Sequence, residues 1–224
     1  MKKLVILVAV LLFASLASQA QTSKGDQTLG ADLGFSYSKG NQLYLDPSSG
    51  SVDNSSNGKT TSFTISPNYS YFIADNLDLG ASLDYVSYVN NANNTNPGYQ
   101  NKNANRTYGA SVFLRKYFMY QNKIGLRVGA YISYDKQTYN YDYPEPNSIN
   151  DYDSNQDDYI GGLNLALVYY PAKHLGLSAS LANLSYTHSK ANNGDQGTSS
   201  NNTVDFGYIN DGLTCSVFYV FGGK

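Results

Sequence analysis

TSFTISPNYSYFIADNLDLGASLDYVSY, the stretch from Thr61 to Tyr88, decides the fold. Apolar residues alternate with small polar ones from Phe63 to Tyr71, and the alternation resumes at Leu77 after a break at 74–76. A period of two is typical of β-strands with one apolar and one polar face. Because the break is only about three residues, the two strands form an antiparallel hairpin. Each arm is long enough to cross a bilayer, which takes about 9–11 residues in a tilted strand.

The same alternation recurs along the chain and predicts eight strands in all. Besides the two arms of the hairpin, they are expected at 28–38, 107–118, 124–136, 158–170, 175–188 and 203–221. Long polar connections are expected at 39–59, 91–106, 137–157 and 189–202, and short turns at 74–76, 119–123 and 171–174.

Two of these strands contain an irregularity. A phase shift in the strand at 175–188 predicts a β-bulge near Ala182 and Asn183. In the last strand, Asn210-Asp211-Gly212 predicts a bulge or bend, and the alternative is a turn after which the strand begins at Leu213.

An even number of strands with alternately long and short connections predicts an all-β, eight-stranded, antiparallel up-and-down transmembrane β-barrel. Both termini would then lie on the short-turn side, in the periplasm. Aromatic pairs such as Tyr117/Phe118 and Tyr169/Tyr170 near the strand ends are interpreted as a girdle at the membrane boundary. The alternative is a secreted, lipocalin-like barrel whose apolar faces point inward.

The first 20 residues have the form of a secretory signal peptide. Lys2 and Lys3 precede an apolar run, and Ser18-Gln19-Ala20 is a small-x-small cleavage site. The alternative, a transmembrane anchor, has too short an apolar run. Residues 21–224 are expected to form one outer-membrane barrel domain. The 22 Tyr and the 14% of charged residues are compatible with a surface that meets lipid headgroups.

Several segments carry a resemblance to a known family. ISPNYSYFIADNLDLGASLDY, VFLRKYFMYQNKIGLRVGAY, YPAKHLGLSASLANLSY and LTCSVFYVF resemble the small eight-stranded outer-membrane barrels of the OmpA/OmpX type, in the variant common in Bacteroidota. The resemblance covers the whole mature chain. It implies an outer-membrane location in a Gram-negative cell and a terminal aromatic assembly signal, here Phe221, although Gly222-Gly223-Lys224 follow it. It implies no particular activity.

Charged residues on the polar faces point to the barrel interior. They are Asp32, Asp78, Asp84, Arg115 and Arg127. A narrow interior requires that such charges be paired. We therefore expect an internal ion-pair network that plugs the lumen, and the functional alternative is a gate for small ions.

The sequence offers little chemistry for catalysis or metal binding. Its two histidines, His174 and His188, lie at opposite ends of one predicted strand, and no Gly-x-Ser-x-Gly or His-Glu-x-x-His is present. Asp151-x-Asp153-x-Asn155 begins like a calcium loop, but Gln156 and Gly162 replace the required Gly and Glu. Cys215 is the one cysteine, so no intrachain disulfide forms. We expect no enzyme, no metal and no cofactor.

The expected function is therefore structural and interactive: a barrel that displays polar, tyrosine-rich loops for surface binding or adhesion. The alternative is a narrow channel or transporter for small ions or apolar solutes, and a less favoured one is a surface lipid-modifying hydrolase using His188. Expected partners are outer-membrane lipid or lipopolysaccharide, the barrel-assembly and periplasmic chaperone machinery, and an extracellular ligand of the loops. The near-neutral charge of −2 argues against nucleic acid.

Overall fold

The computed structural model describes residues 22–45, 52–93, 100–142, 153–192, 197–208 and 214–222. The predicted signal peptide lies outside them. The described residues form nine antiparallel strands: β1 (Gln27–Leu45), β2 (Val52–Ala74), β3 (Leu77–Asn93), β4 (Gln100–Tyr120), β5 (Ile124–Asp142), β6 (Asp153–Ala172), β7 (Leu175–Asn192), β8 (Thr198–Tyr208) and β9 (Thr214–Phe221). No helix in this described part is long and apolar enough to span a bilayer.

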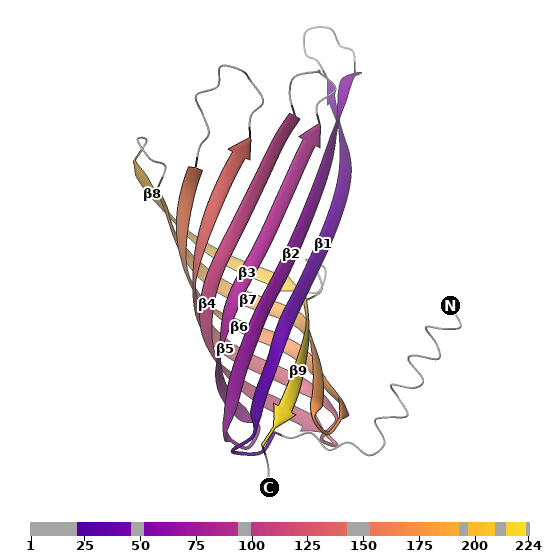
Figure 1. Cartoon of the computed structure of the whole chain (residues 1–224), viewed down its shortest axis with the longest axis vertical. Coiled ribbons are helices and arrows are strands. Elements are labelled where there is room, and N and C mark those ends of the chain that lie inside the picture. Colours follow the sequence, from indigo (N-terminus) through magenta and orange to yellow (C-terminus); the bar gives the residue numbers. More distant parts are fainter. Residues whose placement is uncertain are drawn as a thin grey trace, which may run out of the picture.

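The strands close into a ring. Each strand from β1 to β7 pairs with the next along the chain, and β9 joins β7 to β1. Figure 1 shows the result, a barrel with tilted strands that widens toward one end. The prediction of an all-β antiparallel barrel is confirmed.

The strand predicted at 203–221 is two strands in the structure. β8 pairs with the upper part of β7, from Ala182 to Asn192, and β9 pairs with its lower part, from Leu175 to Ala179. The two therefore occupy successive positions along one edge of β7 and together stand in for the predicted eighth strand. The residues between them, 209–213, where the bend or turn was predicted, lie outside the described residues.

The four predicted long loops are wrong in extent, because most of their residues belong to strands. The β1–β2 ladder runs without a break from Gln27↔Tyr71 to Leu43↔Ser55, well past the expected end near residue 38. Where both faces of a hairpin meet water, the side chains on both faces are polar and the period of two disappears. Alternation therefore marks where a strand has one apolar face, not where its backbone pairing ends.

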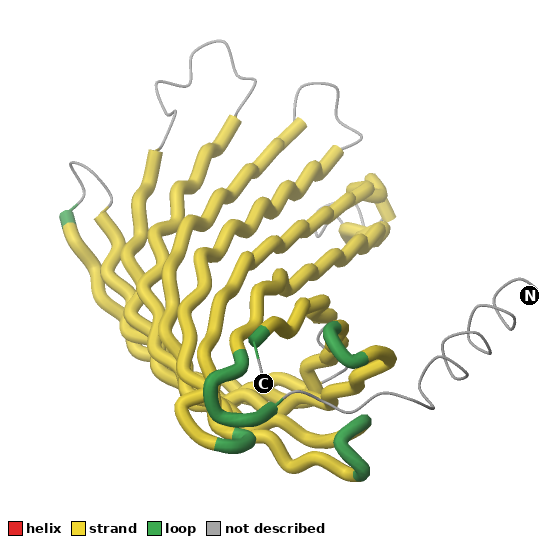
Figure 2. Tube along the Cα trace, turned by 60° about the horizontal axis from the view of Figure 1, so that its bottom comes forward, coloured by secondary structure: helices red, strands yellow, loops and turns green. Residues whose placement is uncertain are grey.

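The short turns lie where they were predicted, at one end of the barrel that we call the short-turn end (Figure 2). Asn76 has a φ of 58°, and Gln121 and Asn122 have φ values of 49° and 53°. Such left-handed conformations match the right-handed twist of the flanking strands in tight hairpins.

The bulge predicted near Ala182 is observed one residue earlier, because the β6–β7 register skips Leu181.

The two faces of the sheet differ in chemistry. Large apolar side chains point outward and remain exposed, among them Leu33, Leu83, Val112, Ile132 and Leu163. Polar side chains such as Ser66, Ser70 and Ser178 are buried in the interior. This arrangement is the reverse of a soluble domain, so the inward-facing, lipocalin-like alternative is wrong.

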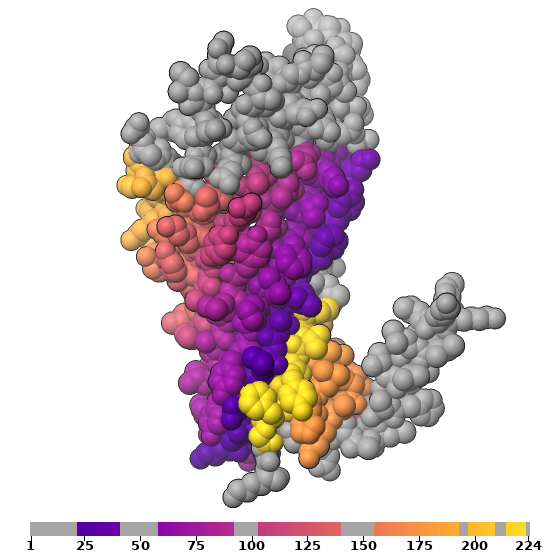
Figure 3. Space-filling model, viewed as in Figure 1, coloured from indigo at the N-terminus to yellow at the C-terminus, as the bar shows by residue number. Residues whose placement is uncertain are grey.

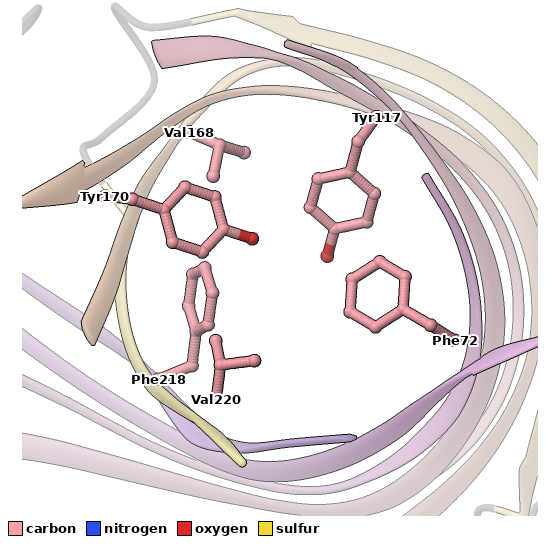
Figure 4. Packing of buried hydrophobic residues seen from close by; sticks show 6 residues of the cluster. All are labelled: Phe72, Tyr117, Val168, Tyr170, Phe218 and Val220. Atoms are coloured by element: carbon pink, nitrogen blue, oxygen red, sulfur yellow. The ribbon is translucent and has the colours of Figure 1, made fainter. Parts of the chain in front are cut away.

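Six large side chains from four strands point into the interior near the short-turn end (Figure 4). They are Phe72, Tyr117, Val168, Tyr170, Phe218 and Val220. Tyr117 and Tyr170 therefore do not belong to the outer girdle, contrary to expectation. Neighbouring residues of a strand face opposite sides, so only Phe118 and Tyr169 of those aromatic pairs point outward.

Candidate functional site

A buried ion pair lies just above this aromatic cluster. Asp78 on β3 and Arg115 on β4 are directly opposite in the register. Arg115 Nε donates to Asp78 Oδ1 at 3.0 Å and Nη2 donates to Oδ2 at 2.5 Å. Asp78 is fully buried and Arg115 is 9% exposed. Bidentate geometry of this kind is the strong form of an arginine–carboxylate contact.

Hydroxyl groups satisfy the remaining lone pairs of the carboxylate. Ser70 donates to Asp78 Oδ2 at 2.7 Å, and the Tyr117 hydroxyl donates to the same oxygen at 3.1 Å. Thr28 in turn hydrogen-bonds Ser70 at 2.6 Å. The pair is thus part of a polar cluster drawn from β1 to β4, as a buried charge requires.

Space for the arginine comes from a glycine on the next strand. Gly129 is the register partner of Arg115, and a Cβ placed there would lie 2.8 Å from Arg115 Cγ. The guanidinium lies over the Phe113 ring, with Cζ 3.9 Å from the ring centroid. The side chain is therefore held flat across the interior.

Above the ion pair the interior contains a cavity of about 450 Å³. Arg115 and Arg127 line it from the side of the short turns. Its wall carries small hydroxyl groups from most of the strands, including those of Ser66, Ser82, Ser111, Ser133, Ser180 and Ser216. Val86, Phe113 and Ile160 add apolar surface. The lining therefore combines charged, hydroxyl and apolar groups.

The structure brings two of the five predicted interior charges into contact and leaves three apart. Asp78 and Arg115 form the one salt bridge among the described residues. Asp32 instead accepts a hydrogen bond from Asn68 Nδ2 at 3.3 Å, and Asp84 accepts from Ser82. Arg127 is 8% exposed. These last three charged residues all line the cavity.

Two further interior acids were missed in the sequence. Asp135 lines the cavity, and its buried Oδ1 has no hydrogen-bond partner. Asp158 is 3% exposed and accepts hydrogen bonds from Gln137 and Gln156. Both lie near the ends of strands predicted from the sequence. Because Asp135 directly follows the outward-facing Tyr134, the alternation along this strand already indicates that the Asp135 side chain points inward.

Among the described residues, strand pairing around the barrel is interrupted next to this cavity. β1 and β9 pair only as far as Gly34↔Thr214, and β8 pairs with β7 alone. Beyond Gly34, the free edges of β1 and β8 face no paired strand among the described residues. Figures 1 and 3 show β9 beside β1 in the lower half and β8 on the opposite side at the top. We call this unpaired line the β1–β8 seam.

The other singled-out residues lie on the outside or at the rims. His174 Nδ1 lies 2.8 Å from the carbonyl of Val220 at the short-turn end, whereas His188 Nδ1 lies 2.8 Å from Asn202 Oδ1. Cys215 is an exposed free thiol. Phe221 ends β9 and stacks beside Tyr219; its role as an assembly signal stays a prediction.

Comparisons with known proteins identify no family. No family model matches the chain, and no curated protein matches it. Among solved structures it is similar to OprG from Pseudomonas aeruginosa (13% identity, 90% of this chain and 98% of that one, TM-score 0.47). It is also similar to Neisserial surface protein A (16%, 88% and 98%, 0.46) and to the outer membrane protein AlkL (14%, 93% and 95%, 0.41). At these identities and TM-scores, nothing about the function of this chain follows from the likeness.

Proposed function

We propose that this chain is an outer-membrane barrel that lets a small, uncharged solute with apolar surface leave its cavity sideways through the β1–β8 seam into the membrane. This is the transport alternative of the sequence analysis, and the geometry favours it over a purely structural role. In this proposal the chain is not an enzyme. The observation that carries it is that the described residues of β1 and β8 are not paired with each other at the level of the cavity.

The outer surface supports insertion into a bilayer. Exposed apolar side chains lie between aromatic residues at both ends of the strands, such as Tyr69 and Phe118 at the short-turn end and Tyr108 and Tyr134 beyond the apolar band. Soluble monomers rarely expose apolar patches of more than a few hundred Å², whereas a membrane barrel has such a band flanked by aromatic girdles. With the predicted signal peptide, this supports an outer-membrane location with periplasmic termini.

The interior of the short-turn end supports a sideways rather than a straight path. The six side chains of the aromatic cluster and the Asp78–Arg115 pair all lie inside the ring there. An eight-stranded barrel is only just wide enough to be filled by its own side chains. We infer that these residues plug the lumen, so that a solute in the cavity leaves through the seam and not through the periplasmic end.

Uptake of a fluorescent apolar probe tests the proposal. N-phenyl-1-naphthylamine is added to intact cells of a Gram-negative host, with and without the protein, and the initial rise of its fluorescence is recorded. We expect a faster rise with the protein. Ser111→Trp and Ser133→Trp, which fill the cavity, are expected to return the rate to that of the empty host.

A matched control places the same bulk outside the barrel. Ala110 lies next to Ser111 on β4 but points outward, so Ala110→Trp is expected to keep the rate of the wild type. Equal rates in the wild type and the empty host would overturn the proposal. Steady ion conductance of the reconstituted protein would also contradict it, because that requires an open lumen at the short-turn end.

Surface binding remains a second proposal, and the length of the strands favours it. β2 has 23 residues and β4 has 21, roughly twice the 9–11 that a bilayer requires. The excess carries polar hairpins past the aromatic residues, as in the OmpA/OmpX-type barrels that the sequence resembles. Replacing 39–59 and 137–157 by short turns is expected to reduce adhesion to host cells, and unchanged adhesion would count against this role.

A further inference from the structure

Two opposite charges line the cavity without forming an ion pair. Arg127 on β5 is 8% exposed and Asp32 on β1 is half-buried. Neither forms a salt bridge with a described residue. Asp32 accepts a hydrogen bond from the Asn68 amide at 3.3 Å, and Arg127 lies beside the Tyr117 hydroxyl. Both of these neighbours are neutral, and a buried charge without an opposite charge is costly.

Strand pairing places the two charges on opposite walls of the ring. β5 follows β1 by way of β2, β3 and β4 in one direction, and by way of β9, β7 and β6 in the other. Leu33, the neighbour of Asp32, leads through successive register partners to Lys136 on β5 by the first way. By the second way it leads to Leu126. Because the strands are tilted, the level of Leu33 on β5 is midway between these two residues.

The two charges also lie at similar heights in the barrel. The midpoint on β5 is residue 131, and β1 and β5 run in the same direction, so Asp32 is level with residue 130. Arg127 is about three residues, or roughly 10 Å of strand, closer to the short turns. Its long side chain covers part of the distance. The gap between the guanidinium and the carboxylate is therefore mainly the width of the cavity that both residues line.

Hydroxyl groups surround the carboxylate of this pair. Ser66 on β2 and Ser216 on β9 are the register partners of Asp32 on its two sides. Both serines are buried and both line the cavity. An ammonium group has three donors, so it can donate to the carboxylate and to the two hydroxyl oxygens together.

The other charges of the cavity determine which ligand charge is favoured. Asp84 and Asp135 add two more carboxylates to the lining, whereas the charge of Arg115 is balanced by Asp78. A simple anion would be attracted by Arg127 but repelled by three carboxylates. A simple cation would leave Arg127 without a counter-charge. A molecule that carries one charge of each sign satisfies both walls and leaves the net charge of the interior unchanged.

We propose that the cavity binds a small zwitterion of the amino acid class, with its carboxylate on Arg127 and its ammonium group on Asp32. The volume of about 450 Å³ is within the range of small-molecule sites. A zwitterion does not enter hydrocarbon, so it is a second ligand of the cavity and not the solute that leaves through the seam. The site rests on the cavity alone and requires neither the seam nor solute release.

An NMR titration with three molecules of nearly equal shape tests the site. The full-length folded protein, labelled with ¹⁵N in non-ionic detergent micelles, is titrated with L-alanine, with isobutyrate, which lacks the ammonium group, and with L-alaninamide, which lacks the carboxylate. The titrations are run at constant salt and about pH 6, where amino groups are protonated and carboxylates ionised. Each charge-assisted contact is worth about tenfold in affinity. We therefore expect alanine to shift the amide signals of Gly129 and Ser216 with a Kd at least about tenfold lower than either analogue.

Removing one charge at a time assigns each end of the ligand to its wall. Asp32→Asn is expected to remove the preference for alanine over isobutyrate and to keep part of the preference over alaninamide. Arg127→Gln is expected to do the opposite. A general loss of structure would not move the two ratios in opposite directions. Asp75→Asn and Lys123→Gln make the same changes of charge in the short turns, and both are expected to keep both preferences.

The proposal is overturned if alanine causes no saturable shift in the wild type, or if either analogue binds the wild type as tightly as alanine. It is also overturned if Asp32→Asn keeps the full preference over isobutyrate. Heat-modifiable gel migration shows that each variant is folded; should Arg127→Gln not fold, the Asp32 variant and the wild-type series decide the matter. Uptake of N-phenyl-1-naphthylamine is measured separately, so the failure of the solute route and the failure of this site are distinguishable.

Discussion

The lower half of the barrel, from the short turns to the Gly34↔Thr214 rung, is a closed ring of strands, whereas above that rung the described residues of β1 and β8 are not paired with each other. The interiors differ in the same way. Large aromatic side chains and a bidentate ion pair occupy the lower interior, while small hydroxyl groups surround a cavity above it. One sheet therefore encloses a densely packed interior at one end and a cavity at the other, beside which its described edges are unpaired.

The difference shows that strand pairing and interior packing change together along the axis. β9, which closes the ring, is also the strand that supplies Phe218 and Val220 to the aromatic cluster. β8, which among the described strands pairs with β7 alone, is exposed along most of its length. Substitutions in the lower half are therefore expected to cost far more stability than equivalent ones above it.

Removing Asp78 is expected to have the largest effect. Asp78→Ala leaves the guanidinium of Arg115 buried without its carboxylate, which costs about 3–5 kcal/mol in the free energy of unfolding. Urea unfolding of protein refolded into phospholipid vesicles measures the loss. Far-UV circular dichroism is the suitable probe because the chain has no Trp.

Asp84→Ala is the matched substitution in the upper interior. Asp84 is half-buried, accepts hydrogen bonds from Ser82 and forms no salt bridge with a described residue. Its removal is expected to cost less than about 1 kcal/mol. Equal losses for Asp78→Ala and Asp84→Ala would show that the two halves do not differ in the way described.

Truncating an aromatic residue of the last strand sharpens the comparison. Phe218 is 5% exposed and packs edge-on against Tyr170 with centroids 5.6 Å apart. Phe218→Ala leaves a cavity and is expected to cost about 3–4 kcal/mol. Phe206 on β8 is 66% exposed, so Phe206→Ala is expected to cost about 1 kcal/mol or less in the same assay. A larger loss for Phe206→Ala than for Phe218→Ala would show that the stabilising packing lies in the upper half of the barrel instead.

The smallest effect is expected at the upper rim. Asn202 Oδ1 accepts a hydrogen bond from the Tyr186 hydroxyl and lies 2.8 Å from His188 Nδ1. Both contacts are at the surface. Asn202→Ala is expected to change the free energy of unfolding by no more than about 0.5 kcal/mol. A loss above about 1 kcal/mol would mean that the open end is held more firmly than its free edges suggest.

Much of the fold could be predicted because alternation reports directly which face of a strand meets an apolar environment. The hairpin around 74–76, the short turns and the inward positions of Asp78, Arg115 and Arg127 all follow from counting residues by twos. The bulge in β7 could be placed to within one residue for the same reason.

The remainder depends on contacts that a one-dimensional pattern does not contain. Alternation put Asp78 and Arg115 on the same side, but only the register places them opposite each other. The ends of the strands were missed because Asn, Ser and Gly on both faces remove the period while the ladder continues. The seam depends on the absence of a described pairing between β8 and β1. No single residue of β8 indicates this absence.

The position of β9 has a consequence for how the chain reaches its final shape. Ring closure joins Gln27 to Phe221, two residues near opposite ends of the sequence, so the step carries the largest loop entropy in the molecule. The remaining described ladders join strands that follow one another in the chain, or join β7 to β9. We therefore expect the ladder between β1 and the eight-residue β9 to form last, so that the sheet becomes a cylinder only at the end of folding.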